Sequence, residues 1–405
     1  MRILVQKFGG TSVGTAERRQ QVVAKITAAK AAGYAPLVVV SALGRAGEPY
    51  ATDTLLTLAK EECSAIGKRE QDLIMACGEI VAGVIVVGAL KKAGLEAVFL
   101  TGQQAGIITT PAHGDAQIIR IDPRGVTDHL AAGRIVVVAG FQGASENGEI
   151  TTLGRGGSDT SAAALAAAVK AEAAEIYTDV DGIMTADPRV VPEAGTIPVI
   201  SYEEAYQLAI QGAKVIHPRA VEIALRHGLP LRIKSTAGDA DGTLVTGDRD
   251  GTIERLRGRV AVGLAHKNGY GVIRLTWGKG GAGAAVLGRL AATGLDADLI
   301  NLTPQGVEII AAQADIELAA AQAAAAGLSV AAKAEDCAKI SLIGCSAPAA
   351  AVVNMFVDLL RQAKIGVLQT YTGPYAVSGI VATADLVAAL RALHAGVLGQ
   401  RGKGE

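Results

Sequence analysis

Residues 3–12 read ILVQKFGGTS, an apolar run that ends at Lys7-Phe8 and passes through two glycines into hydroxyl residues. Such a run is typical of a strand buried on both faces, and a helical stretch, 16–32, follows it. Glycines let a backbone approach a ligand closely, and the free N–H groups of a helix N-terminus attract anions. With the charge of Lys7, the segment predicts either a phosphate site or a tight turn capped by Ser12.

The same strand–helix order repeats through the first 235 residues. Strands are predicted at 3–8, 35–41, 97–101, 134–141, 174–178 and 229–233. Helices are predicted at 16–32, 53–62, 71–93, 158–171 and 201–227. Repeated β-α-β order indicates an α/β fold, a mostly parallel sheet sandwiched by helices, which we assign to residues 1–240.

A polar, glycine-rich connector at 241–260 precedes a different pattern. One βαββα unit is predicted from strands at 272–277, 295–302 and 307–314 with helices at 282–293 and 316–326. A similar unit follows, with strands at 339–344, 366–371 and 375–382 and helices at 348–364 and 386–394. This repetition predicts two ferredoxin-like α+β modules, at 261–335 and 336–400.

Composition excludes several classes of function. Lys plus Arg number 38 and Asp plus Glu 39 in 405 residues, and aromatic residues are 3%, which argues against a nucleic-acid partner. The apolar run at 80–90 is too short to span a bilayer, so we expect a buried helix, no membrane association and no signal peptide. Four widely spaced cysteines predict neither a disulfide framework nor a zinc site, and we expect a cytoplasmic protein.

A second glycine motif, TLGRGGSDTS at 152–161, again leads from a loop into a helix. A capped, buried helix would explain Ser158 and the alanines that follow, but it would not explain Arg155 among the glycines. Arginine suits two-pronged recognition of a carboxylate, so this loop predicts an anion-binding site.

Two further segments carry weaker signals. The acidic loop TDVDGIMTADPR at 178–189 is either a solvated turn or part of a site. Glu79 lies in an otherwise apolar helix, where a buried carboxylate is rare unless paired, so its partner is either structural or a ligand ammonium. No P-loop or protein-kinase motif occurs. The stretch GKGGAG at 278–283, with Asp298 beyond it, matches a dinucleotide fingerprint, but a glycine turn in a small module fits better.

Together, KFGGTS at 7–12, TLGRGGSD at 152–159, TDVDGIMTADPR at 178–189 and the segment 212–214 resemble the aspartokinases of the amino-acid-kinase superfamily. The resemblance covers essentially the whole chain, because the two C-terminal modules resemble the ACT domains of monofunctional aspartokinases. SALGRAGEPYATD at 41–53 is most similar to the short Bacillus-type branch that senses diaminopimelate. The implied fold is therefore an amino-acid-kinase sheet followed by two ACT modules.

The resemblance also implies a set of site residues. Lys7 and Asp159 are expected to be catalytic, with Asp159 orienting the phosphate-binding lysines. ATP would contact Lys7, Phe8, Gly9, Gly10, Thr178, Asp179, Met184, Arg189 and Lys214, although Met184 stands where family members often have tyrosine. Aspartate would contact Ser41, Thr52, Glu79, Arg155 and Ser158. No metal site of the chain's own is expected, since Mg²⁺ would be carried by ATP.

The implied activity is transfer of a phosphoryl group from ATP to the β-carboxylate of L-aspartate, giving 4-phospho-L-aspartate. This is the first step towards diaminopimelate, lysine, threonine and methionine, with feedback at the ACT modules by diaminopimelate, lysine or threonine, in a homodimer. The residues leave three alternatives open: another carboxylate kinase resembling N-acetylglutamate kinase, an ACT-containing NAD-dependent dehydrogenase, and an amino-acid sensor without catalysis.

Overall fold

The computed structural model describes residues 1–247, 260–277, 288, 290–292, 294–325, 329–344 and 348–399. The chain forms two compact units whose segments alternate along the sequence. The first unit comprises Met1–Met184, Thr196–Ile210 and Lys214–Arg257. The second comprises Thr185–Gly195, Gln211–Ala213 and Gly258–Glu405.

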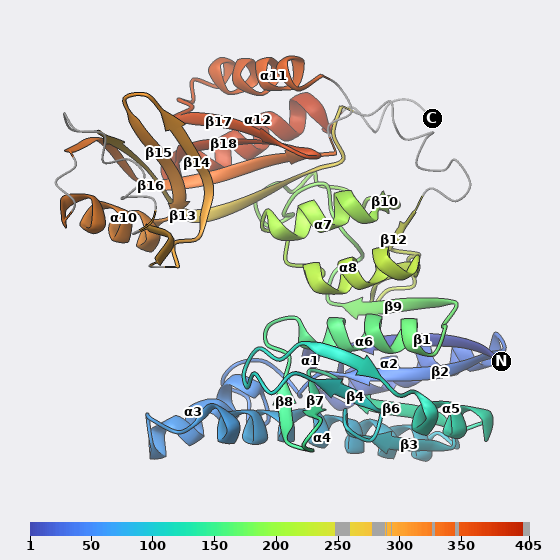
Figure 1. Ribbon diagram of the computed structural model, residues 1–405. Helices are drawn as coiled ribbons and strands as arrows, with labels where there is room; N and C mark the ends of the chain where they lie inside the picture. The colour runs from blue at the N-terminus through green and yellow to red at the C-terminus, as the bar shows by residue number, and fades with distance from the viewer. Residues whose placement is uncertain are drawn as a thin grey trace. The chain divides into compact units, whose positions relative to one another are not determined.

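The first unit is built on an eight-stranded, mostly parallel sheet in the order β10-β12-β11-β9-β1-β2-β6-β3 (Figure 1). Its central strands β1, β2, β6 and β9 pair in parallel, whereas β12 runs antiparallel to β11 and β10, which pairs in parallel with β12, runs in the same direction as β12. The strands are β1 (Arg2–Phe8), β2 (Tyr34–Val40), β3 (Ala97–Leu100), β6 (Ile135–Ala139), β9 (Ala173–Thr178), β10 (Val199–Ser201), β11 (Leu231–Ser235) and β12 (Thr243–Thr246). The predicted α/β fold class of this part is confirmed.

Helices α2 (Ala16–Ala31) and α4 (Lys68–Lys92) cover one face of this sheet. Val22, Ile26 and Val86 pack there against Val38 and Ile135, and all five are fully or almost fully buried. The opposite face carries α6 (Gly157–Ala168), whose Ser158 adjoins Gly140 at the end of β6. Strands with apolar side chains on both faces therefore form the middle layer of a sandwich.

Helix α4 is long and apolar enough, by length and composition alone, to cross a membrane, so the prediction that its apolar run is too short to do so is wrong, and 39% of its most apolar window is buried. Its buried stripe includes Ala82, Val86 and Leu90, which join the core beneath the sheet. The same helix also buries the carboxylates of Asp72 and Glu79 inside the unit. Packing on the sheet therefore buries part of the apolar surface of α4.

A four-stranded sheet, in the order β5-β4-β7-β8, flanks the main one. The elements of the first unit that the sequence pattern did not predict are mostly short: α1 (Gly10–Val13), β4 (Ile107–Thr109), β5 (Ile118–Ile121), α5 (Arg124–Ala131), β7 (Gln142–Ser145), β8 (Ile150–Thr152), β10 and β12. Helix α3 (Thr52–Glu62) was predicted.

The single helix predicted at 201–227 is wrong, because the chain forms α7 (Tyr202–Ile210) and α8 (Pro218–His227). Gly212, at φ 123, interrupts the helix, and Pro218 with the capping His217 starts the next one.

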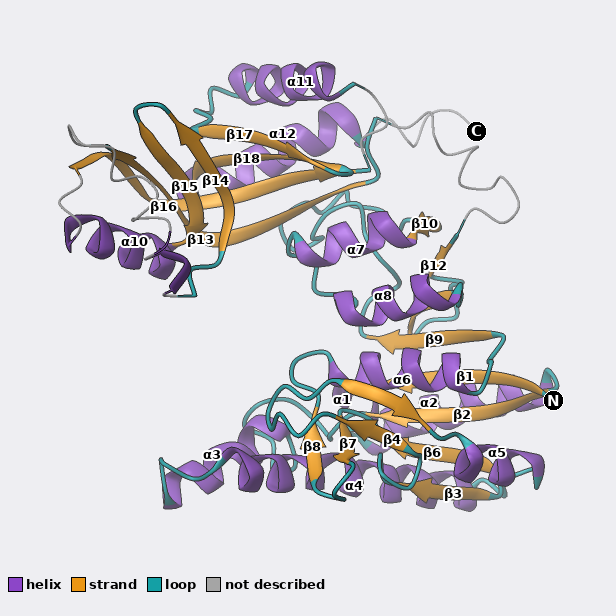
Figure 2. Ribbon diagram, in the orientation of Figure 1, coloured by secondary structure: helices purple, strands orange, loops and turns teal. Residues whose placement is uncertain are grey.

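The second unit is an antiparallel six-stranded sheet in the order β14-β15-β13-β16-β18-β17 (Figure 2). Its strands are β13 (Gly263–Thr276), β14 (Ala297–Thr303), β15 (Gly306–Ala312), β16 (Ser329–Ile343), β17 (Gln369–Gly373) and β18 (Ala376–Ala382). Its helices are α10 (Gln313–Ala325), α11 (Ala349–Gln362), the 3-10 turn η2 (Thr383–Asp385) and α12 (Leu386–Val397). The antiparallel α+β class predicted for this part is confirmed.

Strands β13 and β16 are much longer than the sequence pattern predicts, and they pair with each other along both halves of the sheet. One half carries β14, β15 and α10, and the other carries β17, β18, α11 and α12. The sheet curls so that Lys339 of β16, almost fully buried, forms an ion pair with Asp298 of β14. Burial lowers the pKa of Lys339, and the Asp298 carboxylate opposes that effect. The glycine stretch at 278–283 lies outside the described residues.

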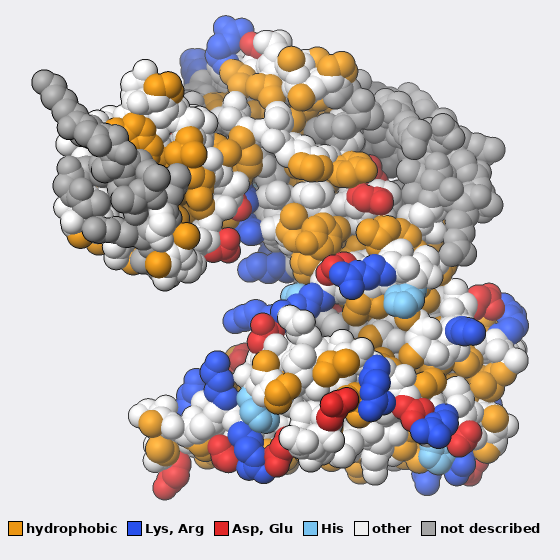
Figure 3. Space-filling model, viewed as in Figure 1, with side chains coloured by type: hydrophobic (Ala, Val, Ile, Leu, Met, Phe, Trp, Pro, Cys, Tyr) orange, Lys and Arg blue, Asp and Glu red, His pale blue; other side chains and the backbone are white. Residues whose placement is uncertain are grey.

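Basic and acidic side chains are interspersed on the face of the first unit that Figure 3 displays. This distribution matches the formal net charge of -1.

Candidate functional site

Several of the predicted residues follow the carboxyl ends of parallel strands in the first unit. Gly9 follows β1, Ser41 follows β2 and Asp179 follows β9, and Gly140, which was not predicted, follows β6. Because these strands run in parallel, their carboxyl ends lie along one edge of the sheet, called here the carboxyl edge. In open α/β sheets, ligands bind in the crevice outside this edge.

Lys7 and Asp159 meet at the carboxyl edge. The Lys7 Nζ atom lies 2.7 Å from Asp159 Oδ1, and the two side chains are only 12% and 13% exposed. Asp159 belongs to the first turn of α6, where backbone N–H groups point outward and favour negative charge. The pair therefore places a fixed positive charge beside a helix N-terminus.

A small polar pocket opens at Gly10 and Ser41, close to the ends of β1 and β2. It has a volume of about 200 Å³ and is lined by Gly10, Ser41, Ala42, Gly44, Arg45, Ala46, Ala51, Thr52 and Asp53. Gly10 permits the close approach of α1 to the following loop, because a Cβ there would lie 2.4 Å from the carbonyl oxygen of Ala42. The residues predicted for aspartate at the start of this loop, Ser41 and Thr52, line the pocket together.

Glu79 is buried beside the pocket, with a side chain that is 2% exposed. Its Oε1 atom accepts a hydrogen bond from the backbone N–H of Ala42 at 3.0 Å. Its Oε2 atom is buried and has no hydrogen-bond partner among the described residues. Burial raises the pKa of Glu79 to about 8, and the hydrogen bond from Ala42 only partly offsets this shift. A buried carboxylate with an unused oxygen suits a cationic ligand group.

Arg155 and Ser158 occupy the second glycine motif. Ser158 is 9% exposed and lies beside Gly140 at the carboxyl edge. Arg155 is exposed, in the turn between β8 and α6. The loop is thus anchored by its buried helical end and presents the guanidinium to solvent.

The residues predicted to contact the nucleotide lie in different parts of the chain and differ in exposure. Thr178 and Asp179 lie at the end of β9, and Asp179 forms an ion pair with Arg45 at 2.9 Å. Met184 is half-buried in the first unit, where its sulfur accepts a hydrogen bond from Thr196 at 3.4 Å. Lys214 is exposed in the turn between α7 and α8.

Two predicted nucleotide residues have other surroundings. The Phe8 side chain is fully buried and stacks on Tyr177 with ring centroids 4.7 Å apart, so Phe8 offers a ligand only its backbone. Arg189 belongs to the second unit, where it forms an ion pair with Asp187 at 2.7 Å.

Comparison with known proteins identifies the family of this chain. Residues 2–235 match the amino acid kinase family. Aspartokinase 1 of Bacillus subtilis is 42% identical over 398 residues, which cover 97% of this chain and 98% of the relative. The chain belongs to the aspartokinases. Aspartokinase 2 of the same organism is 49% identical over 245 residues, 60% of this chain and 59% of that protein.

A solved aspartokinase structure confirms the fold over the whole length. Escherichia coli aspartokinase III, in complex with aspartate and ADP in its R-state, superposes with a TM-score of 0.76 at 25% identity. The match covers 98% of this chain and 100% of that chain. The aspartokinase architecture predicted from the sequence, an amino-acid-kinase sheet followed by an α+β region of ACT type, is therefore confirmed.

Three polar residues at or near this region were not singled out from the sequence. Arg45 lines the pocket and also pairs with Asp179. Thr236 follows β11 at the carboxyl edge and shares a 2.7 Å hydrogen bond with Ser12. Asp72 is fully buried on α4. Thr236 could have been found by its place after a predicted parallel strand, whereas Asp72 stands in the polar first turns of α4, where a charged residue is no signal.

Proposed function

We propose that the chain transfers the γ-phosphoryl group of MgATP to the β-carboxylate of L-aspartate. The observation that carries this proposal is the Glu79 carboxylate, buried beside a polar pocket with one oxygen unused. An amino acid brings an ammonium group that can pair with this oxygen, whereas an N-acylated substrate brings none. A related structure supports the same substrate, since aspartokinase III of Escherichia coli was solved in complex with aspartate and ADP.

Aspartate would be held by Ser41, Thr52, Glu79, Arg155 and Ser158. Glu79 would pair with the ammonium, and Arg155 would bind a carboxylate through its planar fork of donors. Ser41 and Thr52 already share the pocket, and Ser158 lies at the carboxyl edge. The exposed side chain of Arg155 leaves it free to close over the bound amino acid.

ATP would lie along the carboxyl edge, with Lys7, Gly9, Gly10 and the backbone of Phe8 at its phosphates. Thr178, Asp179, Met184 and Lys214 would line the nucleotide, whereas Arg189, which lies in the second unit, is not included. Mg²⁺ would arrive on the phosphates of ATP, because the magnesium ion prefers phosphate oxygens and water to an all-protein cage.

The residues fit a reaction that needs no general base. The aspartate side chain is ionised at neutral pH, since its ordinary pKa is about 3.9. Catalysis then requires that two anions be aligned and that charge on the transferring group be neutralised. Lys7 supplies that charge, and Asp159, 2.7 Å away, orients its ammonium group.

We further propose that an end product regulates the enzyme through the second unit. Diaminopimelate is the first candidate, followed by lysine and threonine. A homodimer would suit this unit, because its edge strand β14 exposes Ile300 and Leu302 at 45% and 56%. We assign the enzyme to the cytoplasm.

The test is ADP release from MgATP with L-aspartate, with the acyl phosphate trapped by hydroxylamine. It is run with and without diaminopimelate, lysine and threonine, and with the Lys7→Ala variant. We expect turnover by the wild type, a fall in kcat of several orders of magnitude for Lys7→Ala, and inhibition by one of the three amino acids. Activity with another carboxylate but none with aspartate would refute the substrate assignment.

A further inference from the structure

We propose that Asp72 is a positioning residue for the Arg155 loop, residues 153–156. It holds this loop at a fixed position relative to helix α4 and so sets the affinity for aspartate. The inference rests on the proposed function, because it concerns the same amino-acid site. Asp72 itself contacts neither the pocket nor the Lys7–Asp159 pair in the described structure.

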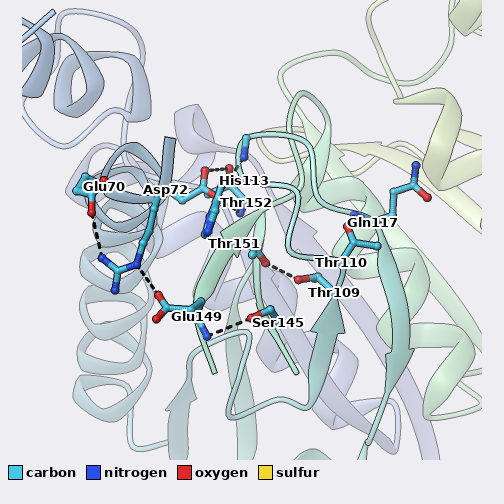
Figure 4. Close-up of polar contacts among 12 residues, drawn as sticks. Glu70, Asp72, Thr109, Thr110, His113, Gln117, Ser145, Glu149, Thr151 and Thr152 are labelled. Carbon is cyan, nitrogen blue, oxygen red and sulfur yellow. Dashed lines mark hydrogen bonds and ion pairs between the residues drawn. The ribbon is translucent and has the colours of Figure 1, made fainter. Parts of the chain in front are cut away.

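The Asp72 carboxylate is the centre of a buried network (Figure 4). Its Oδ2 atom lies 2.9 Å from His113 Nδ1 and accepts hydrogen bonds from the backbone N–H of Gly114 at 3.1 Å and of Thr152 at 3.0 Å. Its Oδ1 atom accepts a hydrogen bond from the Thr152 hydroxyl at 2.6 Å. The side chain is 0% exposed. One carboxylate therefore joins three segments that are distant in sequence: α4, the loop before β5, and the end of β8.

Two of these segments support the Arg155 loop directly. Thr152 ends β8, and the chain continues from it into the loop. Gly154, at φ 71, is packed so closely against the segment after His113 that a Cβ there would lie 2.9 Å from Asp115 Oδ1. Arg219 also contacts the loop and the segment after His113. It donates a hydrogen bond to the carbonyl oxygen of Leu153 at 3.0 Å and forms an ion pair with Asp115 at 2.8 Å.

The third segment, α4, carries the other half of the amino-acid site. Asp72 and Glu79 are seven residues apart, which is about two helical turns, so both face the interior on the same side of α4. Glu79 is the partner proposed for the ammonium, and Arg155 is the partner proposed for a carboxylate. Asp72 thus links the two groups that must be spaced correctly for one small substrate.

The effect expected from loosening this link is selective. Substrate-positioning contacts act through small displacements, and a shift of about 1 Å can be costly for binding and rate. A displaced Arg155 loop should raise the KM for aspartate. It should change the KM for ATP much less, because Lys7 and the end of β9 make no described contact with the network, and Asp159, the partner of Lys7, lies in α6 beyond the loop.

The experiment compares three conservative variants. Asp72→Asn keeps the shape of the side chain and removes its charge, while Thr152→Val removes only the hydroxyl that donates to Asp72. Thr151→Val is the matched control, since Thr151 is equally buried and its hydroxyl bonds instead to Thr109 at 2.5 Å (Figure 4). The KM for aspartate, the KM for ATP and kcat are measured for each full-length protein.

We expect Asp72→Asn and Thr152→Val to raise the KM for aspartate roughly 10-fold, the scale at which supporting hydrogen bonds act on a site. Thr151→Val should leave it within twofold of the wild type. Equal effects of Thr151→Val and Thr152→Val, or a change confined to kcat or to the KM for ATP, would show a merely structural role and overturn the inference. If Asp72→Asn does not fold, the two threonine variants still decide.

Failure of the proposed function gives a different result. A wild type that does not phosphorylate aspartate overturns the proposed function and this inference together. A wild type that phosphorylates aspartate, with unchanged KM values in Asp72→Asn and Thr152→Val, overturns the inference alone.

Discussion

Asp72 and Glu79 are both buried carboxylates on the interior side of α4, yet their surroundings differ. Asp72 has polar partners for both oxygens, including two backbone N–H groups and the Thr152 hydroxyl. Glu79 receives one hydrogen bond from the chain, and its second oxygen has no partner among the described residues. Complete hydrogen bonding accounts for the burial of Asp72, whereas the unpartnered oxygen of Glu79 is the feature that our proposal assigns to a ligand ammonium.

The largest effect expected from this comparison concerns stability. Asp72→Ala should lower the unfolding free energy of the first unit by about 3–5 kcal/mol, because it leaves several buried donors without an acceptor. Urea unfolding measures this loss, and amide hydrogen exchange under native conditions measures it in α4. Glu79→Gln is the control and should leave exchange in α4 unchanged, since the amide can keep the hydrogen bond from Ala42. Similar losses in both variants would contradict the distinction between the two carboxylates.

Glu79→Gln should instead act on substrate binding. Removing the negative charge that faces a buried ammonium should cost about 2–3 kcal/mol, so the KM for aspartate should rise roughly 30- to 150-fold. The KM for ATP should stay within about twofold of the wild type. Steady-state kinetics with each substrate varied in turn measure both constants. A raised KM for ATP with an unchanged KM for aspartate would assign Glu79 to the nucleotide.

The raised pKa of Glu79, about 8, makes aspartate binding dependent on pH. Below this value the free protein holds a proton on Glu79, which must leave before the carboxylate can pair with the ammonium. The dissociation constant for aspartate should therefore rise as pH falls from 8 to 6, by at most about 10-fold per unit. Calorimetry in buffers of different ionisation enthalpy should detect the released proton. The dependence should vanish in Glu79→Gln, and a wild type without proton release would refute the prediction.

Stability should depend on pH in the opposite sense. The folded pKa of Glu79 lies above its ordinary value of 4.5, so the folded protein binds a proton that the unfolded chain releases. The contribution of Glu79 to stability without ligand is therefore full below about pH 4.5 and is lost as pH rises towards 8. Comparing urea midpoints of the wild type and Glu79→Gln across this range isolates that contribution, and parallel midpoints would contradict it.

The smallest effect is expected at an exposed ion pair. Arg45 and Asp179 are 68% and 51% exposed, so water and salt screen their attraction. Arg45→Gln should change the unfolding free energy by no more than about 0.5 kcal/mol. Urea unfolding at low and at 1 M salt checks this, and a loss comparable to that of Asp72→Ala would show that the pair is more than a surface contact.

The sequence predicted the parts of the fold that depend on local pattern. The buried strands of the central sheet and the long helices α2 and α4 follow directly from apolar runs and periodicity. Short strands such as β7 and β8 have too few residues for a pattern, and their partners lie elsewhere in the chain. The length of β13 and β16 was also missed, because the pairing that extends them is between strands far apart in sequence.

The residues of the candidate site also fall into those that the sequence pattern indicates and those that only the fold brings together. Lys7, Glu79 and Arg155 stand out because charged residues at glycine turns or in apolar helices are unusual on their own. Asp72 was hidden because its importance comes from His113 and Thr152, which no spacing rule connects to it. The pairing of Arg45 with Asp179 likewise joins two loops that only the folded sheet brings together.

The alternation of segments between the two units has a mechanical consequence. Met184 is the last residue of one segment of the first unit, and Thr185 begins a segment of the second, where its backbone oxygen accepts a hydrogen bond from Leu264 at 2.7 Å. The loop at 178–189 therefore changes units in its middle. A movement of the second unit that pulled on Thr185 would reach Met184 through a single peptide bond. The backbone thus connects the two units directly at this point, and a displacement of Thr185 would need no side-chain contact to reach Met184.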